Sequence, residues 1–186
     1  MPRSILCTIL GLVALCCFGA EPAATFRVRE NRSITEHFVG FGGQMNPYLW
    51  CRPNADLIND ARSLDLEQKI LALAPQHVRI FVLPHWWDGR PDDVSRGDPR
   101  TKDSFLRTVE LAQRAGASIN LTFWYGPYPH PEQTGQRFAE ILDELIHQRK
   151  LIAIRYATIQ NEPNDSTKIT LDLYNRLYRA FDAALR

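Results

Sequence analysis

Four strand-like segments alternate with four helix-like segments along this chain, and this order constrains the fold more than any other feature. Apolar runs that predict strands begin at Phe38, His77, Ser118 and Ile154. Apolar helical stripes follow them: Leu66, Ile70 and Leu73; Phe105, Val109 and Ala112; Phe138, Ile141 or Leu142, and Leu145; and Leu173, Leu177 and Phe181. Because helical crossovers connect parallel strands, the alternation predicts an α/β fold with a parallel sheet.

Long loops follow the strand-like segments, whereas the connections from helix to strand are short, as at 74–77 and 116–118. In parallel α/β folds, binding and catalytic residues gather at the carboxyl ends of the strands. The candidate segments are therefore 42–44, 83–87, 124–128 and 161–164. The first strand leads into GFGG, which lacks the spacing of a dinucleotide-binding loop, so the sequence disfavours nucleotide binding.

The N-terminus has the features of a signal peptide. Arg3 precedes an apolar run at 5–15 that is too short to span a bilayer, and the best cleavage position follows residue 19. Without that segment Cys51 is the only cysteine, which excludes an internal disulfide framework and a cysteine-rich zinc site. We therefore expect a signal peptide at 1–19, an N-terminal extension at 20–37 and one domain at 38–186, in a secreted or periplasmic protein without a membrane anchor.

The candidate segments combine indole rings, amides and one central acid. Sugar rings present C–H groups to aromatic faces, and their hydroxyls need directional hydrogen-bond partners, so this combination favours a carbohydrate ligand. The net charge of +1 gives no reason to expect nucleic acid or an anionic membrane as a partner. His85, His130 and Glu132 lack the spacing of a zinc motif, and we expect no metal and no cofactor.

Asn161-Glu162-Pro163 ends the fourth strand-like run and supplies the acid. At that position Glu162 could protonate a glycosidic oxygen while Asn161 holds a neighbouring hydroxyl group. The residues that we expect to contact substrate are Asn161, Arg79, His85, Trp86, Trp124 and Tyr125. Arg79 could equally be a structural ion-pair residue, and Trp86 is favoured over Trp87.

The segment IRYATIQNEPN resembles the fourth-strand motif of the clan A glycoside hydrolases, the retaining (β/α)8 enzymes that include families 5, 30 and 39. The resemblance implies that Glu162 is the general acid/base and that Asn161 binds the sugar 2-hydroxyl. VRIFV resembles the second-strand segment whose arginine, here Arg79, lies under the nucleophile, and GFGGQ is similar to the first-strand opening. Covering 38–186, the resemblance implies the N-terminal half of a TIM barrel, about four β/α units, nearest to family 5 or 39.

The second carboxylate is the missing part of this interpretation. Retaining glycosidases need two carboxylates about 5–5.5 Å apart, and the resemblance puts the nucleophile on a seventh strand. The acids near the strand ends, Asp88, Asp92, Asp93 and Glu132, lie on loops and are predicted to be solvated. We therefore expect a hydrolase that is incomplete as given and belongs to a longer protein. The alternatives are a non-catalytic carbohydrate-binding module of the same fold, or an unrelated α/β protein in which Asn-Glu-Pro merely ends a strand.

Overall fold

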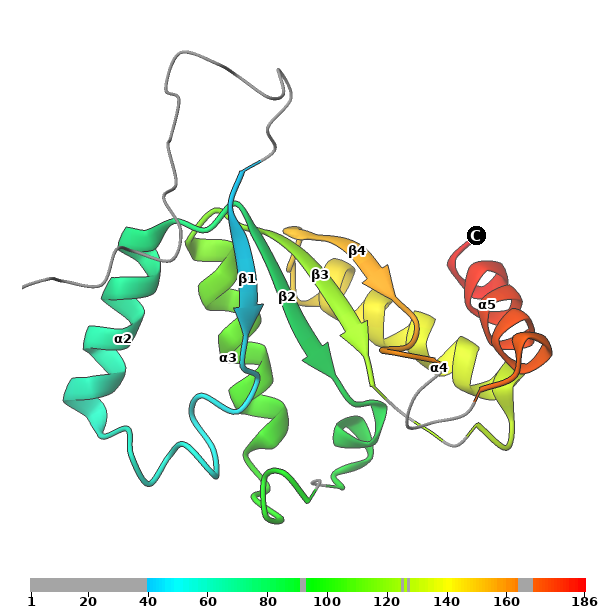
Figure 1. The fold of residues 1–186 in the computed structure, drawn as a ribbon, viewed down its shortest axis with the longest axis horizontal. Coiled ribbons are helices and arrows are strands. Elements are labelled where there is room, and N and C mark those ends of the chain that lie inside the picture. Colours follow the sequence, from blue (N-terminus) through cyan, green and yellow to red (C-terminus); the bar gives the residue numbers. More distant parts are fainter. Residues whose placement is uncertain (1–39, 91–92, 125, 127, 164–168) are drawn as a thin grey trace, which may run out of the picture. The chain divides into compact units, whose positions relative to one another are not determined.

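The computed structural model describes residues 40–186 apart from 91–92, 125, 127 and 164–168 (Figure 1). By their contacts, residues Val39–Arg186 form one compact unit. The expected signal peptide and N-terminal extension, and Tyr125 among the expected substrate contacts, lie outside the described residues. Within the described part, no helix has both the length and the apolar character needed to cross a membrane.

The strands form one parallel sheet in the order β1-β2-β3-β4 (Figure 1). Their bounds are Gly42–Met45 for β1, His77–Val82 for β2, Ser118–Phe123 for β3 and Ile154–Thr158 for β4. In register, Gln44 pairs with Arg79, Arg79 with Asn120, and Asn120 with Tyr156. The α/β fold with a parallel sheet is thus confirmed, and all four carboxyl ends point the same way.

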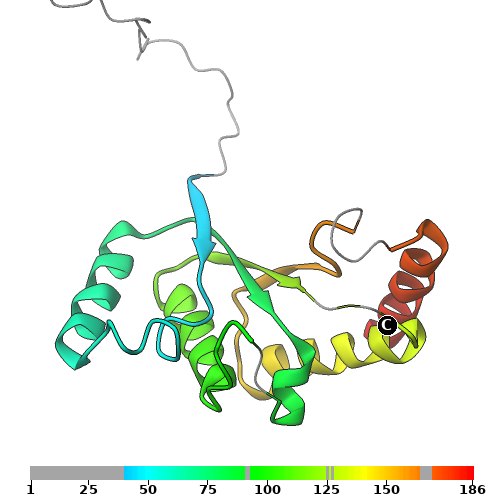
Figure 2. The ribbon, with the colours of Figure 1, turned by 60° about the horizontal axis from the view of Figure 1, so that its bottom comes forward.

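Four α-helices alternate with the described strands: α2 Asp60–Leu73, α3 Thr101–Arg114, α4 Pro131–Asp143 and α5 Leu171–Leu185. A 3₁₀ turn, η2 Pro84–Asp88, follows β2, and a π turn, η3 Glu144–Gln148, extends α4. Helices α3 and α4 lie on the same face of the sheet (Figures 1 and 2). No described helix covers the opposite face.

The core lies between the sheet and these two helices. Phe105, Val109 and Ala112 of α3 are fully buried, as the helical stripe predicts. On the next helix Phe138 stacks on Phe123 of β3, with ring centroids 4.0 Å apart. The predicted stripes of α3 and α4 are confirmed because each meets the apolar face of the sheet.

Helix α2 is less buried than its sequence stripe suggests. Asn59 caps its start by accepting a hydrogen bond from the Arg62 amide at 3.0 Å, and Pro75 follows its end. Its predicted inward residue Leu73 is nevertheless 76% exposed. With Ile70 it lines a hollow of about 620 Å³ beside β1. The stripe of α2 is therefore only partly covered among the described residues, since Leu66 and Ile70 are half-buried while Leu73 is exposed.

The first strand lies further along the chain than the apolar run predicted. We expected a strand from 38 that ends in a glycine turn, but the glycines themselves form β1. A Cβ on Gly42 would lie 2.6 Å from the backbone oxygen of His77, whereas one on Gly43 would meet nothing within 4 Å. Gly42 thus permits the close approach of β1 to β2.

We expect Gly42→Ala to destabilise the fold by about 1–3 kcal/mol, because the added methyl group would push β1 away from β2. The free energy of unfolding from urea titration measures the effect. Gly43→Ala is the matched control in the same strand, with an expected change of less than about 0.5 kcal/mol. Equal losses for both variants would contradict the close-approach explanation.

Candidate functional site

The chain beyond β4 stays beside β3 and carries the expected site to the carboxyl edge of the sheet. The backbone N–H of Asn161 donates to the carbonyl of Phe123, the last residue of β3, at 3.1 Å. Asn161 is only 8% exposed, yet its side-chain amide forms no hydrogen bond with any described residue. The amide atoms are not among the fully buried unpaired polar atoms of the described residues, so they keep some access to solvent and are available to a ligand.

Glu162 follows with an unusual backbone conformation. Its φ angle is +47°, in the left-handed region that residues with a side chain rarely adopt. Its side chain is exposed and forms no ion pair within the described part of the chain. Such strain persists where surrounding contacts impose it, and it often accompanies a functional position. Asn161 and Glu162 therefore present an amide and an acid side by side, neither tied to another described residue.

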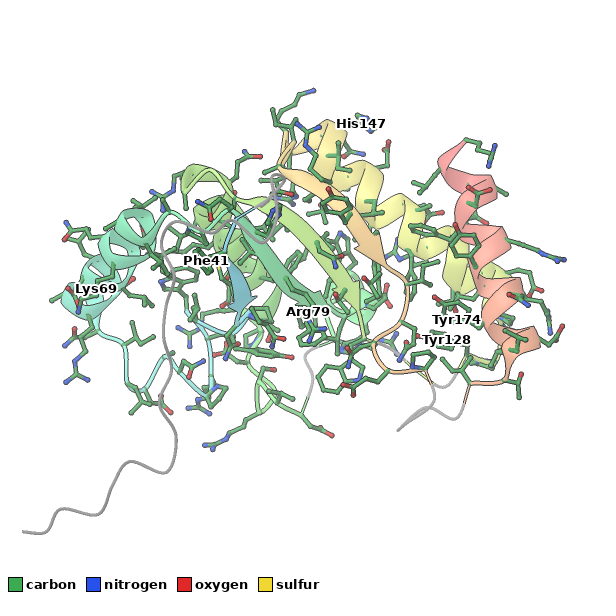
Figure 3. The ribbon with its side chains drawn as sticks, turned by 45° about the horizontal axis from the view of Figure 1, so that its top comes forward. Phe41, Lys69, Arg79, Tyr128, His147 and Tyr174 are labelled. Carbon is green, nitrogen blue, oxygen red and sulfur yellow. The ribbon has the colours of Figure 1, made fainter. Side chains whose placement is uncertain are left out.

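Arg79 lies on β2 at the face that no described helix covers (Figure 3). Its Nη2 donates to Oε1 of Gln44 at 2.8 Å, and its guanidinium carbon lies 4.7 Å from the ring centroid of Phe81. Phe81 in turn contacts Trp124, with centroids 5.1 Å apart. Since its partner is an amide rather than a carboxylate, the structural ion-pair interpretation of Arg79 finds no support among the described residues.

The two neighbouring tryptophans after β2 are both structural. Trp86 is 3% exposed and packs against Tyr48 and Phe105, with centroids 5.8 and 5.5 Å away. This position corrects the expectation that Trp86 contacts substrate, because a residue that is almost entirely buried offers no ring face to a sugar. Trp87 donates from Nε1 to Glu144 at 2.6 Å. Trp124, by contrast, is 44% exposed and keeps a ring surface open to solvent.

His85 is half-buried and lies in a separate hollow of about 220 Å³ between η2 and the start of α4. His130 and Asp88 share this hollow with two arginines, Arg90 and Arg137. Hydrogen bonding from Arg90, reinforced by the charge of Arg137, holds the pKa of the Asp88 carboxyl below its usual value. The structure therefore places His85 among charged loop residues, and Asn161 and Glu162 do not line this hollow.

The other acids that the sequence puts near strand ends are engaged or exposed. Glu132 accepts from Nε and Nη2 of Arg176 at 2.7 and 3.1 Å, and this contact lowers the pKa of Glu132. Asp93 is exposed, and Asp92 lies outside the described residues. Residues that the structure describes contain no cluster of three His, Cys, Asp or Glu side chains that could hold a metal ion. None of these acids stands out as a nucleophile beside Glu162.

Two buried polar residues at this edge were missed by the sequence analysis. Tyr128, from the loop after β3, is 3% exposed, and Gln160, directly before Asn161, is 2% exposed. The Tyr128 hydroxyl donates to Oε1 of Gln160. A glutamine inside the apolar run IRYATIQ was the available signal, since a buried amide requires a partner.

Asp98 ties the loops after β1 and β2 together. Its carboxylate accepts from the Arg52 amide at 3.0 Å and from the amide, Nε and Nη2 of Arg100 at 2.9, 3.0 and 2.7 Å. The Arg100 hydrogen bonds, with that from Arg52, hold the pKa of Asp98 far below its usual value. The Asp98 side chain is only 4% exposed while that of Arg100 is 58% exposed, so the carboxylate end of this contact is shielded from solvent.

We expect Asp98→Asn to cost about 2–4 kcal/mol of unfolding free energy. A carboxyl with a lowered folded pKa stabilises the fold above its unfolded pKa, and this contribution is lost as the pH falls through about 4 and below. Denaturant titrations between neutral and acidic pH should therefore show a smaller acid-induced loss in the variant. Asp65→Asn, which breaks an exposed pair with Lys69, should change stability by less than about 0.5 kcal/mol. If Asp98→Asn lost as much unfolding free energy on acidification as the wild-type protein, Asp98 would not be the source of this pH dependence.

The φ angle of Glu162 gives a stability test that is independent of any ligand. Glycine adopts a positive φ without the steric cost of a Cβ, so Glu162→Gly should be more stable than Glu162→Ala by about 1 kcal/mol. Thermal unfolding followed by circular dichroism compares the two. At Glu110, inside α3 and equally exposed, the order should reverse because glycine weakens a helix. An alanine variant at 162 as stable as the glycine variant would mean that the position is unstrained.

Comparison with known proteins adds little to this geometry. No family model matches the chain, and no curated protein matches it. A crystal structure of a GH5_18 variant from Bifidobacterium longum subsp. longum ATCC 55813, in complex with Manb1-4GlcNAc, is similar with a TM-score of 0.49 and 16% sequence identity. The match covers 79% of this chain but 41% of that one, so the chain spans less than half the length of that protein. Similarity at this level does not establish residue roles, which depend on the side chains at the edge of the sheet.

Proposed function

We propose that this chain is part of a secreted glycoside hydrolase that cleaves O-glycosidic bonds by a retaining, two-carboxylate mechanism. The observation that carries the proposal is the Asn161–Glu162 step at the end of β4. There, a largely buried asparagine whose amide has no partner among the described residues adjoins an exposed glutamate in a left-handed backbone conformation. Neither side chain makes a contact with another described residue that would stabilise the fold, so both are better explained by binding and chemistry.

In this proposal Glu162 works as an acid and then as a base. It first donates its proton to the glycosidic oxygen of the leaving sugar, and then takes a proton from the water that completes hydrolysis. Asn161 hydrogen-bonds a hydroxyl group next to the bond that breaks. The nucleophile is not assigned to any described residue, and we propose that it is supplied by strands that complete a barrel around β1–β4.

The face of the sheet that lacks described helices fits the same ligand class. Trp124 is 44% exposed and Tyr156 60% exposed, so both offer ring surface. Arg79 and Gln44 offer hydrogen-bonding groups on the neighbouring strands. Aromatic faces interleaved with polar donors suit a sugar ring, because the ring presents C–H groups to aromatic faces while its hydroxyls need hydrogen-bond partners.

A non-catalytic carbohydrate-binding module is the second candidate, and one observation favours it. Asp88 and Glu132, two of the described acids near the strand ends, are both bound to arginines. A chain that uses Asn161 and the aromatic residues only for binding would need no second free carboxylate.

We expect Glu162→Gln, in the protein extended by the rest of its barrel, to lower hydrolysis of unactivated oligosaccharides by about 10²–10⁴-fold. The rate of hydrolysis of aryl glycosides with good leaving groups should fall less, because these substrates need little proton donation in the first step. Product release measured by anion-exchange chromatography checks both. Glu110→Gln, an exposed acid on α3, serves as the control and should keep full activity.

Full turnover of an unactivated oligosaccharide by Glu162→Gln would overturn the assignment of Glu162. The module is distinguished by titration calorimetry with oligosaccharides. Binding that is abolished by Asn161→Ala, without any cleavage by the extended protein, would favour the module over the hydrolase.

A further inference from the structure

We propose that Tyr128 and Gln160 are positioning residues that hold the Asn161–Glu162 step in its left-handed conformation. Tyr128 lies in the loop between β3 and α4, near the carboxyl end of β4 (Figure 3). Both side chains are almost completely buried, at 3% and 2% exposure. A buried tyrosine hydroxyl and a buried glutamine amide each need a hydrogen-bond partner. Here the hydrogen bonds lead to the backbone of Asn161 in the candidate site.

The contacts form a short chain from the core to the site. The Tyr128 hydroxyl donates to Oε1 of Gln160, and Nε2 of Gln160 donates to the backbone oxygen of Asn161 at 2.7 Å. On its other side, the backbone N–H of Asn161 donates to Phe123 at 3.1 Å. The backbone of Asn161 is therefore held at both its donor and its acceptor.

The Asn161 carbonyl, which only accepts, and the Tyr128 hydroxyl together fix which way the glutamine amide points. A glutamine has an oxygen that accepts and a nitrogen that donates, and the two ends have nearly the same shape. With its oxygen engaged by the Tyr128 hydroxyl, the amide must turn its nitrogen toward the carbonyl of Asn161. Without that hydroxyl, the oxygen end of the amide loses its partner, and the Gln160 side chain is free to move away from the Asn161 carbonyl.

The peptide that this chain holds is the one that sets the conformation of Glu162. The carbonyl of Asn161 and the nitrogen of Glu162 belong to one planar unit, so fixing the oxygen fixes the plane. The orientation of this plane is coupled to φ of Glu162, which is +47°. A strained φ persists only where the surroundings over-determine it, and the buried Tyr128–Gln160 pair supplies that constraint.

The hydroxyl of Tyr128 can be separated from its ring. The ring packs edge-on against Phe138, with centroids 6.4 Å apart, so it also belongs to the core. Tyr128→Phe keeps this packing and removes only the donor. Gln160→Glu keeps the acceptor for the phenol but removes the N–H that holds Asn161, which gives an independent second variant.

A double-mutant cycle tests the proposal on the chain itself. In the wild-type background, Glu162→Gly should unfold about 2–4 °C above Glu162→Ala, because only the alanine carries the cost of a Cβ at positive φ. In the Tyr128→Phe or Gln160→Glu background residue 162 can relax, and this gap should fall to less than half. If Tyr128 and Gln160 have only a structural role, their replacement should lower all unfolding temperatures equally and leave the difference between Glu162→Gly and Glu162→Ala unchanged. That result in both backgrounds would overturn the proposal.

A second measurement, which depends on the proposed function, follows saccharide binding by titration calorimetry. Tyr128→Phe should weaken oligosaccharide binding roughly tenfold, on the order of one lost hydrogen bond. Ser104→Ala is the matched control: its buried hydroxyl donates to Pro47 at 2.7 Å in the loop after β1, so it should lose stability without losing affinity.

The two measurements separate the two proposals. If no oligosaccharide binds the wild-type protein, the proposed function fails while the cycle still decides the positioning role. Wild-type affinity in Tyr128→Phe, in a protein that does bind saccharide, would overturn the positioning role for the site.

Discussion

The parallel hydrogen-bond ladder between the strands is the constraint on which the site depends. Because β1 to β4 run the same way and pair in sequence order, their carboxyl ends share one edge. The ladder between β3 and β4 shifts register at Ile119 and Asn120, yet the amide of Asn161 still reaches the carbonyl of Phe123. Backbone pairing alone therefore brings Asn161 close to Trp124, which follows Phe123 in the chain.

The same ladder gives the sheet two different faces. On β3, Phe123 stacks on α4, so alternation turns Leu121 toward the helices and Asn120 away from them. The face turned away carries Arg79 and Tyr156, both exposed in the described part of the chain. Parallel sheets normally bury both faces, and a face built from charged, amide and aromatic side chains is suited to a polar ligand rather than to a dry core.

Sequence patterns predicted the elements whose buried residues repeat at a regular period. They failed where contacts between distant residues determine the bounds of an element or the burial of a side chain. The α3 stripe of Phe105 and Val109 was predictable because a helix that packs on a sheet repeats its apolar residues regularly. The start of β1 was not, because the close approach of Gly42 to the backbone of His77 is a tertiary contact that the local pattern does not show. Trp86 was wrongly expected at the surface of the site, because its sequence neighbourhood does not reveal that Tyr48 and Phe105 enclose its ring. The same holds for the Tyr128–Gln160 pair, which joins two loops 32 residues apart.

The described residues with positive φ include glycines and residues that carry a side chain. Gly89 and Gly116 have φ of 68° and 80° at the ends of η2 and α3, where only the turn matters. Ala74, Arg96 and Lys150 also have positive φ, but they lie at a helix end and in connecting turns. Glu162 differs because it follows a strand at the carboxyl edge, beside Asn161, whose side-chain amide no described residue engages. Glycine would satisfy the backbone there at lower steric cost, so the carboxyl group itself is the feature that needs a chemical explanation.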